Sequence, residues 1–142
     1  MTASDAMDER EAMLRETATI AVVGLSPNPD RPSYRVAQYL QSHGYRIIPV
    51  NPQVPEVLGE PAYPDLGSVP IPVDMVDVFR RSEQVRPVIE DAVRLGIPRI
   101  WLQDGVVDDA GADMARRAGA QVVMDDCTMR VHHRLLGAGR PC

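Results

Sequence analysis

The chain has 142 residues, of which 44% are hydrophobic and 25% charged, and a formal net charge of −5. This composition indicates one soluble globular domain, and it argues against a nucleic-acid surface and against a membrane span. The polar, acidic N-terminus has no signal-peptide pattern, and the two cysteines, Cys127 and Cys142, form no redox or metal motif. We therefore expect a cytoplasmic protein with reduced thiols and no bound metal.

Apolar runs alternate with helical patterns along the chain. The expected strands cover residues 20–23, 45–50, 73–79, 99–103 and 121–124, and the expected helices cover residues 5–17, 32–44, 82–96, 108–118 and 128–136. A proline-rich, irregular loop with one helical turn is expected between the second and third strands. Such alternation predicts parallel β-α-β units and an α/β fold, a Rossmann-like, doubly wound, five-stranded parallel sheet.

The domain organisation follows from this pattern. Residues 1–18 are expected to pack on the domain as an N-terminal helix, residues 19–136 to form the ligand-binding domain, and residues 137–142 to be a flexible tail. Ligands of doubly wound sheets bind at the carboxyl ends of the strands. The third expected strand is apolar except for Asp74 and Asp77, which interrupt the run.

The loop after the first strand resembles a phosphate-binding turn that leads into a helix. A dinucleotide fingerprint would place three glycines here, but Ser26 and Pro29 occupy the second and third positions. Hydroxyls, an arginine and the free N–H groups of Ser33, Tyr34 and Arg35 at the helix start are suited to phosphate. The alternative is a plain turn with a helix-capping serine. The candidate ligand contacts here are Gly24, Leu25, Ser26, Asn28, Arg31, Ser33 and Tyr34.

The ends of the second and third strands supply further candidates. Val50, Asn51 and Pro52 end the second strand and offer no acidic residue for a ribose diol, which disfavours NAD. The alternative for these residues is a strand that simply stops at Asn-Pro. The third strand ends in Phe79, Arg80, Arg81 and Ser82, where Ser82 is expected to begin a second helix that faces the site. The alternative to ligand binding is core packing for Phe79 and, for Arg80 and Arg81, a solvated pair on the surface.

Several of these segments together carry a resemblance to a known family. They are VVGLSPNPDRPSYRVAQYL at 22–40, GYRIIPVNP at 44–52, VDMVDVFRRSEQV at 73–85, IWLQDGV at 100–106 and VVMDDC at 122–127. In combination they resemble the small bacterial CoA-binding proteins, which are related to the N-terminal CoA-binding domain of the succinyl-CoA synthetase α subunit.

The resemblance implies a ligand, coenzyme A or an acyl-CoA. It implies that the ADP part rests at Val50–Pro52 and Phe79, that the arginines meet the phosphates, and that the thiol arm runs past Gln103 and Gly105. The CoA ligases also need a phosphohistidine domain, which a chain of this length does not contain. We therefore expect a non-catalytic carrier, sensor or regulatory protein.

Three other functions stay open from the sequence. One is an NAD(P)-binding domain similar to redox sensors. Another is a small thiol or acyl-CoA enzyme that uses Cys127 as its nucleophile, although a packed, unreactive thiol is the alternative for that residue. The last is an interaction module with a vestigial pocket. A homodimer or an unidentified protein partner is compatible with each of them.

Overall fold

Five parallel strands form the central sheet of the structure, a computed structural model that describes residues 4–136 and the side chains of residues 9–136. In spatial order they are β2 (Arg46–Val50), β1 (Thr19–Val23), β5 (Met75–Val78), β6 (Arg99–Leu102) and β7 (Gln121–Val123). Each strand is short and almost wholly buried, as expected for a parallel sheet covered on both faces. This confirms the expected Rossmann-like, doubly wound fold.

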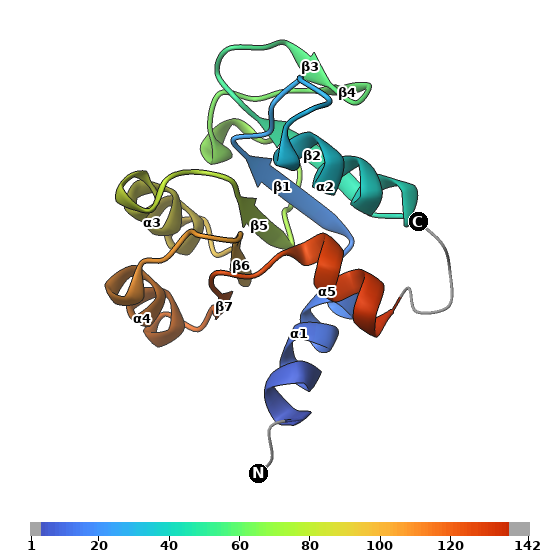
Figure 1. The fold of residues 1–142 in the computed structure, drawn as a ribbon. Helices are drawn as coiled ribbons and strands as arrows, with labels where there is room; N and C mark the ends of the chain where they lie inside the picture. Colours follow the sequence, from blue (N-terminus) through green and yellow to red (C-terminus); the bar gives the residue numbers. More distant parts are fainter. Residues whose placement is uncertain (1–3, 137–142) are drawn as a thin grey trace.

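Helices cover both faces of this sheet (Figure 1). They are α1 (Ser4–Glu16), α2 (Pro32–Ser42), α3 (Arg86–Arg94), α4 (Asp109–Arg117) and α5 (Thr128–Leu135). Side chains of α1, α2 and α5 pack with Ile20 and Val22 of β1 in one core, whereas those of α3 and α4 pack with Ala21 and Val23 in the other. Alternate residues of one strand therefore serve opposite cores.

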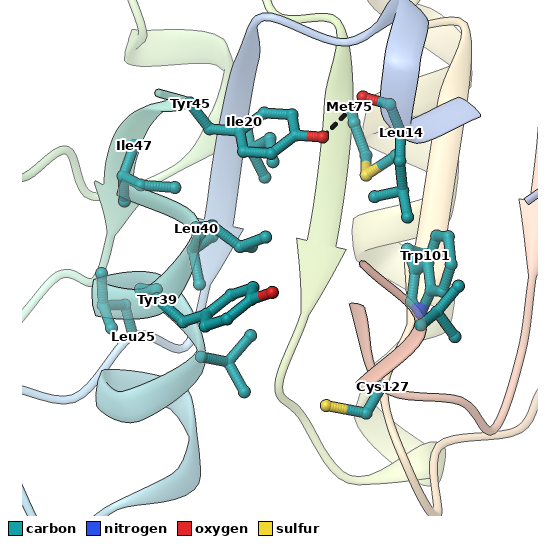
Figure 2. Packing of buried hydrophobic residues seen from close by; sticks show 14 of the residues in the cluster. Leu14, Ile20, Leu25, Tyr39, Leu40, Tyr45, Ile47, Met75, Trp101 and Cys127 are labelled. Atoms are coloured by element: carbon teal, nitrogen blue, oxygen red, sulfur yellow. Dashed lines mark hydrogen bonds between the residues drawn. The ribbon is translucent and has the colours of Figure 1, made fainter. Parts of the chain in front are cut away.

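The N-terminal helix α1 packs on the first of these cores through its last turns. Met13 and Leu14 are buried there, and the Tyr45 hydroxyl donates a hydrogen bond to the Leu14 carbonyl at 2.6 Å (Figure 2). Residues 137–142, expected to be a tail, lie outside the described part of the chain. No helix within the described residues has the length and apolarity to cross a bilayer.

Two local expectations are corrected by the structure. The loop after β2 contains a small hairpin of β3 (Glu56–Val57) and β4 (Glu60–Pro61), and the turn between them has positive φ at Leu58 and Gly59. A leucine is unusual in such a turn, so the sequence pattern did not indicate it.

The second correction concerns the helix after β5. Ser82 begins only a short 3₁₀ turn, Ser82–Gln84, and α3 itself begins at Arg86. Pro87 lies in the first turn of α3, where its missing N–H costs no helical hydrogen bond. The N-terminus of α3 is therefore displaced along the chain from the end of β5, where a ligand of the sheet would bind.

The ends of β1 and β5 approach each other closely at Gly24. This glycine has φ +86°, its N–H donates to the Val50 carbonyl at 3.0 Å, and a Cβ there would collide with the Phe79 carbonyl oxygen. Only glycine tolerates both the backbone conformation and the contact. Gly24 thus allows the carboxyl ends of β2, β1 and β5 to meet in one place.

We expect Gly24→Ala to lower the free energy of unfolding by about 3 kcal/mol or more, because strain at positive φ adds to the clash. Gly44→Ala is the matched control: Gly44 has φ +96° but no atom within 4 Å of a built Cβ. It should lose only about 1 kcal/mol. Urea unfolding of both variants measures the difference, and equal losses would contradict the role of the Phe79 contact.

Candidate functional site

A cavity of about 590 Å³ opens at the carboxyl ends of the central strands. The loops after β1, β5 and β6 and the starts of α2 and α5 contribute to it. This is the edge of the sheet where the strand order reverses between β1 and β5, the usual ligand position in such folds. Its lining residues are Gly24, Ser26, Arg31, Pro32, Ser33, Val36, Phe79, Arg80, Gln103, Asp104, Val106 and Cys127.

Two arginines of the lining have no partner among the described residues. Within the described part of the chain, the guanidinium groups of Arg31 and Arg80 make no hydrogen bond or ion pair. Ser33 lies beside Arg31 and is 5% exposed, and its hydroxyl accepts a hydrogen bond from the Ser26 N–H at 3.0 Å. This side of the cavity therefore presents free positive charge next to the N-terminus of α2, which suits an anionic group.

The N-terminus of α2 offers fewer free donors than the sequence predicted. The N–H groups of Tyr34 and Arg35 donate to the Arg31 carbonyl at 3.1 and 3.2 Å. Pro32 has no N–H. Among the described residues, Ser33 is then the one residue of the first turn whose N–H has no backbone acceptor. The expectation that Ser33, Tyr34 and Arg35 all point N–H groups at a ligand is thus wrong for the last two.

The loop before α2 is held by its own side chains. The Ser26 hydroxyl accepts from the Asn28 N–H at 3.1 Å, and the Asn28 carboxamide oxygen accepts from the Asp30 N–H at 2.9 Å. Asn51, after β2, donates from Nδ2 to the Leu25 carbonyl at 2.9 Å. Asn28 and Asn51 therefore fix the backbone around the cavity and do not line it.

A buried polar network meets the lining of the cavity at Gln103 and forms its floor there. Asp77 of β5 is 0% exposed, and its carboxyl accepts hydrogen bonds from Gln103 Nε2 and from the Thr128 hydroxyl. Gln103 Nε2 also donates to Thr128 Oγ1 at 2.9 Å. Burial raises the pKa of Asp77 to about 7, and the two hydrogen bonds act against that rise.

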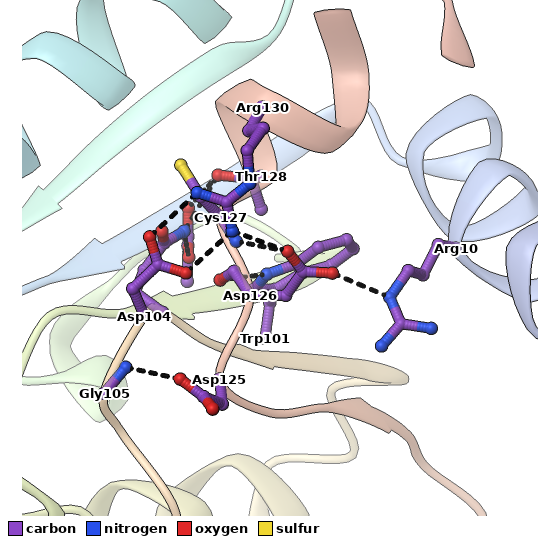
Figure 3. Close-up of polar contacts among 11 residues, drawn as sticks. Arg10, Trp101, Asp104, Gly105, Asp125, Asp126, Cys127, Thr128 and Arg130 are labelled. Carbon is purple, nitrogen blue, oxygen red and sulfur yellow. Dashed lines mark hydrogen bonds and ion pairs between the residues drawn. The ribbon is translucent and has the colours of Figure 1, made fainter. Parts of the chain in front are cut away.

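An ion-pair network holds the neighbouring loops (Figure 3). Arg130 of α5 donates to both carboxylate oxygens of Asp104, at 3.0 and 2.8 Å, and also to Asp126 at 2.9 Å. Arg10 of α1 donates to the other Asp126 oxygen at 3.1 Å. The hydrogen bond to Arg130 is the main cause that lowers the pKa of Asp104. The acidic group of the cavity lining is therefore already neutralised by a cation.

Cys127 precedes α5 and lines the same cavity, although it is only 7% exposed. Burial raises the pKa of its thiol, while backbone N–H groups of Arg130 and Met129 act in the opposite direction. His132 lies on α5 but its Nδ1 pairs with the Tyr39 hydroxyl at 2.9 Å, and burial lowers its pKa. The Nδ1 atom of His132 is therefore occupied by Tyr39, and burial disfavours the charged form of its ring.

The cavity brings together about half of the residues expected from the sequence. Those in its lining are Gly24, Ser26, Arg31, Ser33, Phe79, Arg80 and Gln103. Those outside its lining are Leu25, Asn28, Tyr34, Val50, Asn51, Pro52, Arg81, Ser82 and Gly105.

Some of the residues outside the lining have structural contacts of their own. Leu25 is fully buried in the core, and the Ser82 hydroxyl donates to the Gly105 carbonyl at 3.2 Å. The lining residues that the sequence did not indicate as ligand contacts are Pro32, Val36, Asp104, Val106 and Cys127. The signal available for most of these was their position directly after a strand or at a helix start.

Comparison with known proteins places this cavity in a family context. The pattern of a family described as CoA binding domain matches residues 18–133 of the chain. The uncharacterized protein YneT of Bacillus subtilis is 42% identical over 124 residues, which cover 87% of this chain and 92% of YneT. A solved hypothetical protein from Pyrococcus horikoshii OT3 has 35% identity and a TM-score of 0.89, with 92% of each chain covered.

A more distant relative is an enzyme. The ADP-forming acetate–CoA ligase I of Archaeoglobus fulgidus is 27% identical over 118 residues, which are 76% of this chain but 17% of the ligase. The similarity is thus confined to one part of a much longer protein. These findings confirm the resemblance to the CoA-binding domains of the CoA ligases.

The buried network makes a prediction about stability. The folded chain keeps the Asp77 proton up to about pH 7, whereas the unfolded chain releases it near pH 4. The folded state therefore binds the extra proton between these values, and its stability falls as the pH rises through this window. Relative to Asp77→Asn, the wild type should lose up to about 1.4 kcal/mol per pH unit. Urea unfolding at a series of pH values measures this, and parallel curves for the two proteins would contradict it.

Proposed function

Because the chain belongs to the CoA binding domain family, we propose that it binds coenzyme A or an acyl-CoA in the cavity at the carboxyl ends of its strands. The observation that carries the proposal is that Arg31 and Arg80, in the lining of this cavity, have no partner within the part of the chain that the structure describes. Cations without a protein partner beside a helix N-terminus are suited to phosphate groups, and CoA has a diphosphate and a 3′-phosphate.

The residues of the cavity fit the parts of this ligand. Arg31 and Ser33 at the start of α2 would hold one phosphate group, and Arg80 after β5 another. Phe79 is half-buried beside Gly24 and offers an apolar surface for the adenine ring. Val50, Asn51 and Pro52 remain our candidates for the edge of the adenosine site.

The features around β2 favour CoA over a nicotinamide dinucleotide. A dinucleotide site has an acidic residue after the second strand that binds the ribose diol. Here the residue is Asn51, and its carboxamide is occupied by the Leu25 carbonyl and by the Gln53 N–H, the latter at 2.8 Å. No carboxylate is therefore offered at that position.

We propose a non-catalytic role, as a carrier, sensor or regulatory protein. The support is chemical: among the described residues, the cavity lining holds no histidine, its one carboxylate is paired with Arg130, and its thiol has a raised pKa. A group that exchanges protons near neutral pH and touches the cavity directly is thus missing from the described lining. The ligase activity of the distant relative is not part of the proposal.

Ligand titration of the purified chain by calorimetry tests the proposal. Wild type should bind CoA more tightly than NADH, and Arg31→Met and Arg80→Met should each weaken CoA binding by about tenfold to a hundredfold, because each removes a charge-assisted hydrogen bond. Arg117→Met is the matched control, because Arg117 is exposed on α4 and outside the cavity lining.

Dephospho-CoA separates the roles of the two arginines. If one of them binds the 3′-phosphate, its replacement should weaken CoA binding but leave dephospho-CoA binding unchanged. Absence of CoA binding, or tighter binding of NADH, would refute the proposal.

One observation favours a second function, a thiol-handling enzyme: Cys127 lines the cavity that would hold the CoA thiol arm. The two functions differ in the state of this thiol. A nucleophile needs thiolate at neutral pH, whereas burial raises the pKa of Cys127 and so reduces the thiolate fraction.

Alkylation of Cys127 in a Cys142→Ser background separates these functions. At pH 7 we expect iodoacetamide to alkylate Cys127 more slowly than it alkylates glutathione. The rate of Cys127 alkylation should increase as the pH rises and decrease when CoA is bound. Mass spectrometry of the intact chain follows the reaction. Alkylation at pH 7 that is faster than that of glutathione would favour the enzyme.

A further inference from the structure

The polar floor of the cavity has one unused hydrogen-bonding atom. Gln103 is 4% exposed and lines the cavity, and its Nε2 gives one hydrogen bond to Asp77 and one to Thr128. A carboxamide nitrogen has two hydrogens, so both are committed. The remaining polar atom is Oε1, for which the structure records no donor in the described part of the chain.

Oε1 of Gln103 is not enclosed by protein. Among the described residues, one side-chain nitrogen or oxygen atom is fully buried and has no hydrogen-bond partner, and this atom is Arg99 Nε. Since Oε1 has no recorded donor and is not among such atoms, it keeps contact with the cavity. Its two lone pairs are therefore available to a donor that enters there.

The orientation of this carboxamide is set by its surroundings. Above about pH 7 the Asp77 carboxyl group is ionised and can only accept hydrogen bonds, so it then requires the nitrogen of Gln103 to face it. Thr128 receives from the same nitrogen and donates its own proton to Asp77, which closes the ring of three side chains. Turning the carboxamide over would place oxygen against oxygen and leave a buried carboxylate short of a donor.

The chemistry near Gln103 differs from that near the arginines. Val106 and Cys127 are the other residues of this end of the lining, and the nearby Asp104 is already paired with Arg130. Phosphates would bind at Arg31 and Arg80, so the part of CoA that reaches Gln103 is the uncharged pantetheine arm. That arm carries two amide N–H donors.

On the basis of the proposed function, we propose that Gln103 determines specificity for the pantetheine arm by accepting a hydrogen bond from one of its amide N–H groups through Oε1. Asp77 and Thr128 are positioning residues that keep this oxygen turned toward the cavity. The ligand class that this end selects is an uncharged hydrogen-bond donor, and an adenine nucleotide without the arm does not extend such a donor to Gln103.

Calorimetry at pH 8 with two ligands, CoA and adenosine 3′,5′-bisphosphate, tests this assignment. The bisphosphate is CoA without the phosphopantetheine arm. Gln103→Met should weaken CoA binding by about tenfold and leave bisphosphate binding within about twofold, because it removes the acceptor but keeps the length of the side chain. Gln121→Met, at the amino end of β7, is the matched control and should change neither affinity.

A double variant tests the positioning role. Asp77→Asn combined with Gln103→Glu exchanges the amide and the carboxyl group. An acceptor oxygen still faces the cavity, and the donor of the hydrogen bond that joins the two side chains now comes from β5. This variant should bind CoA within a few-fold of wild type. A loss as large as that of Gln103→Met, with bisphosphate binding retained, would refute the assigned orientation.

The outcomes also separate the inference from the proposed function. Equal weakening of both ligands by Gln103→Met, or no weakening of either, overturns the role of Gln103 while CoA binding by the wild type stands. Failure of the wild type to bind CoA overturns the proposed function itself, and this inference with it. Retained bisphosphate binding by the variant shows that it is folded.

Discussion

A carboxyl group buried in the middle of a parallel sheet constrains the whole functional end of this chain. Asp77 lies on β5, with Val22 of β1 and Trp101 of β6 beside it in register. Such a group costs free energy unless donors surround it. The donors come from Gln103, directly after β6, and from Thr128, the first residue of α5. The hydrogen bonds that Asp77 requires therefore fix the positions of both Gln103 at the cavity and the start of α5.

The acidic and the basic side chains around the cavity differ in whether they form ion pairs. The chain has a net charge of −5, yet Asp104, the acidic residue of the cavity lining, is paired with Arg130, and the neighbouring Asp126 is paired with Arg130 and Arg10. The two arginines of the lining, by contrast, are left without a protein partner in the described residues. Local pairing thus produces a positive cavity in an acidic protein, which net charge alone does not reveal.

The sequence predicted the fold well because the signals that define it are local. Short apolar runs rich in β-branched residues marked the strands, and Pro32 and Gly44 marked the ends of α2. The errors arose where the signal was absent or ambiguous. A hairpin with Leu58 in a positive-φ turn has no composition signal, and Ser82 resembles a helix cap although Pro87 is the stronger start marker.

The candidate site was only partly predictable for a different reason. Rules about strand ends correctly led to Gly24, Arg31, Phe79, Arg80 and Gln103, because in a parallel sheet all carboxyl ends lie at one edge. The rules could not tell a side chain that faces the cavity from one that supports the loop. Which of the two a residue does depends on hydrogen-bond partners distant in the sequence.

Asn51 and Gln103 illustrate this difference and what it implies for binding. Both follow a strand and both carry a carboxamide, yet Asn51 uses its side chain on backbone groups at Leu25 and Gln53, while Gln103 keeps its oxygen for the cavity. A polar group that is held rigidly and left unsatisfied rejects ligands that cannot donate to it, because its desolvation would go uncompensated. Arg31 and Arg80 discriminate less among anions, since a guanidinium attracts any anionic group that fits its planar set of donors. Affinity at one end of the cavity and selectivity at the other would then be separate properties of the same fold.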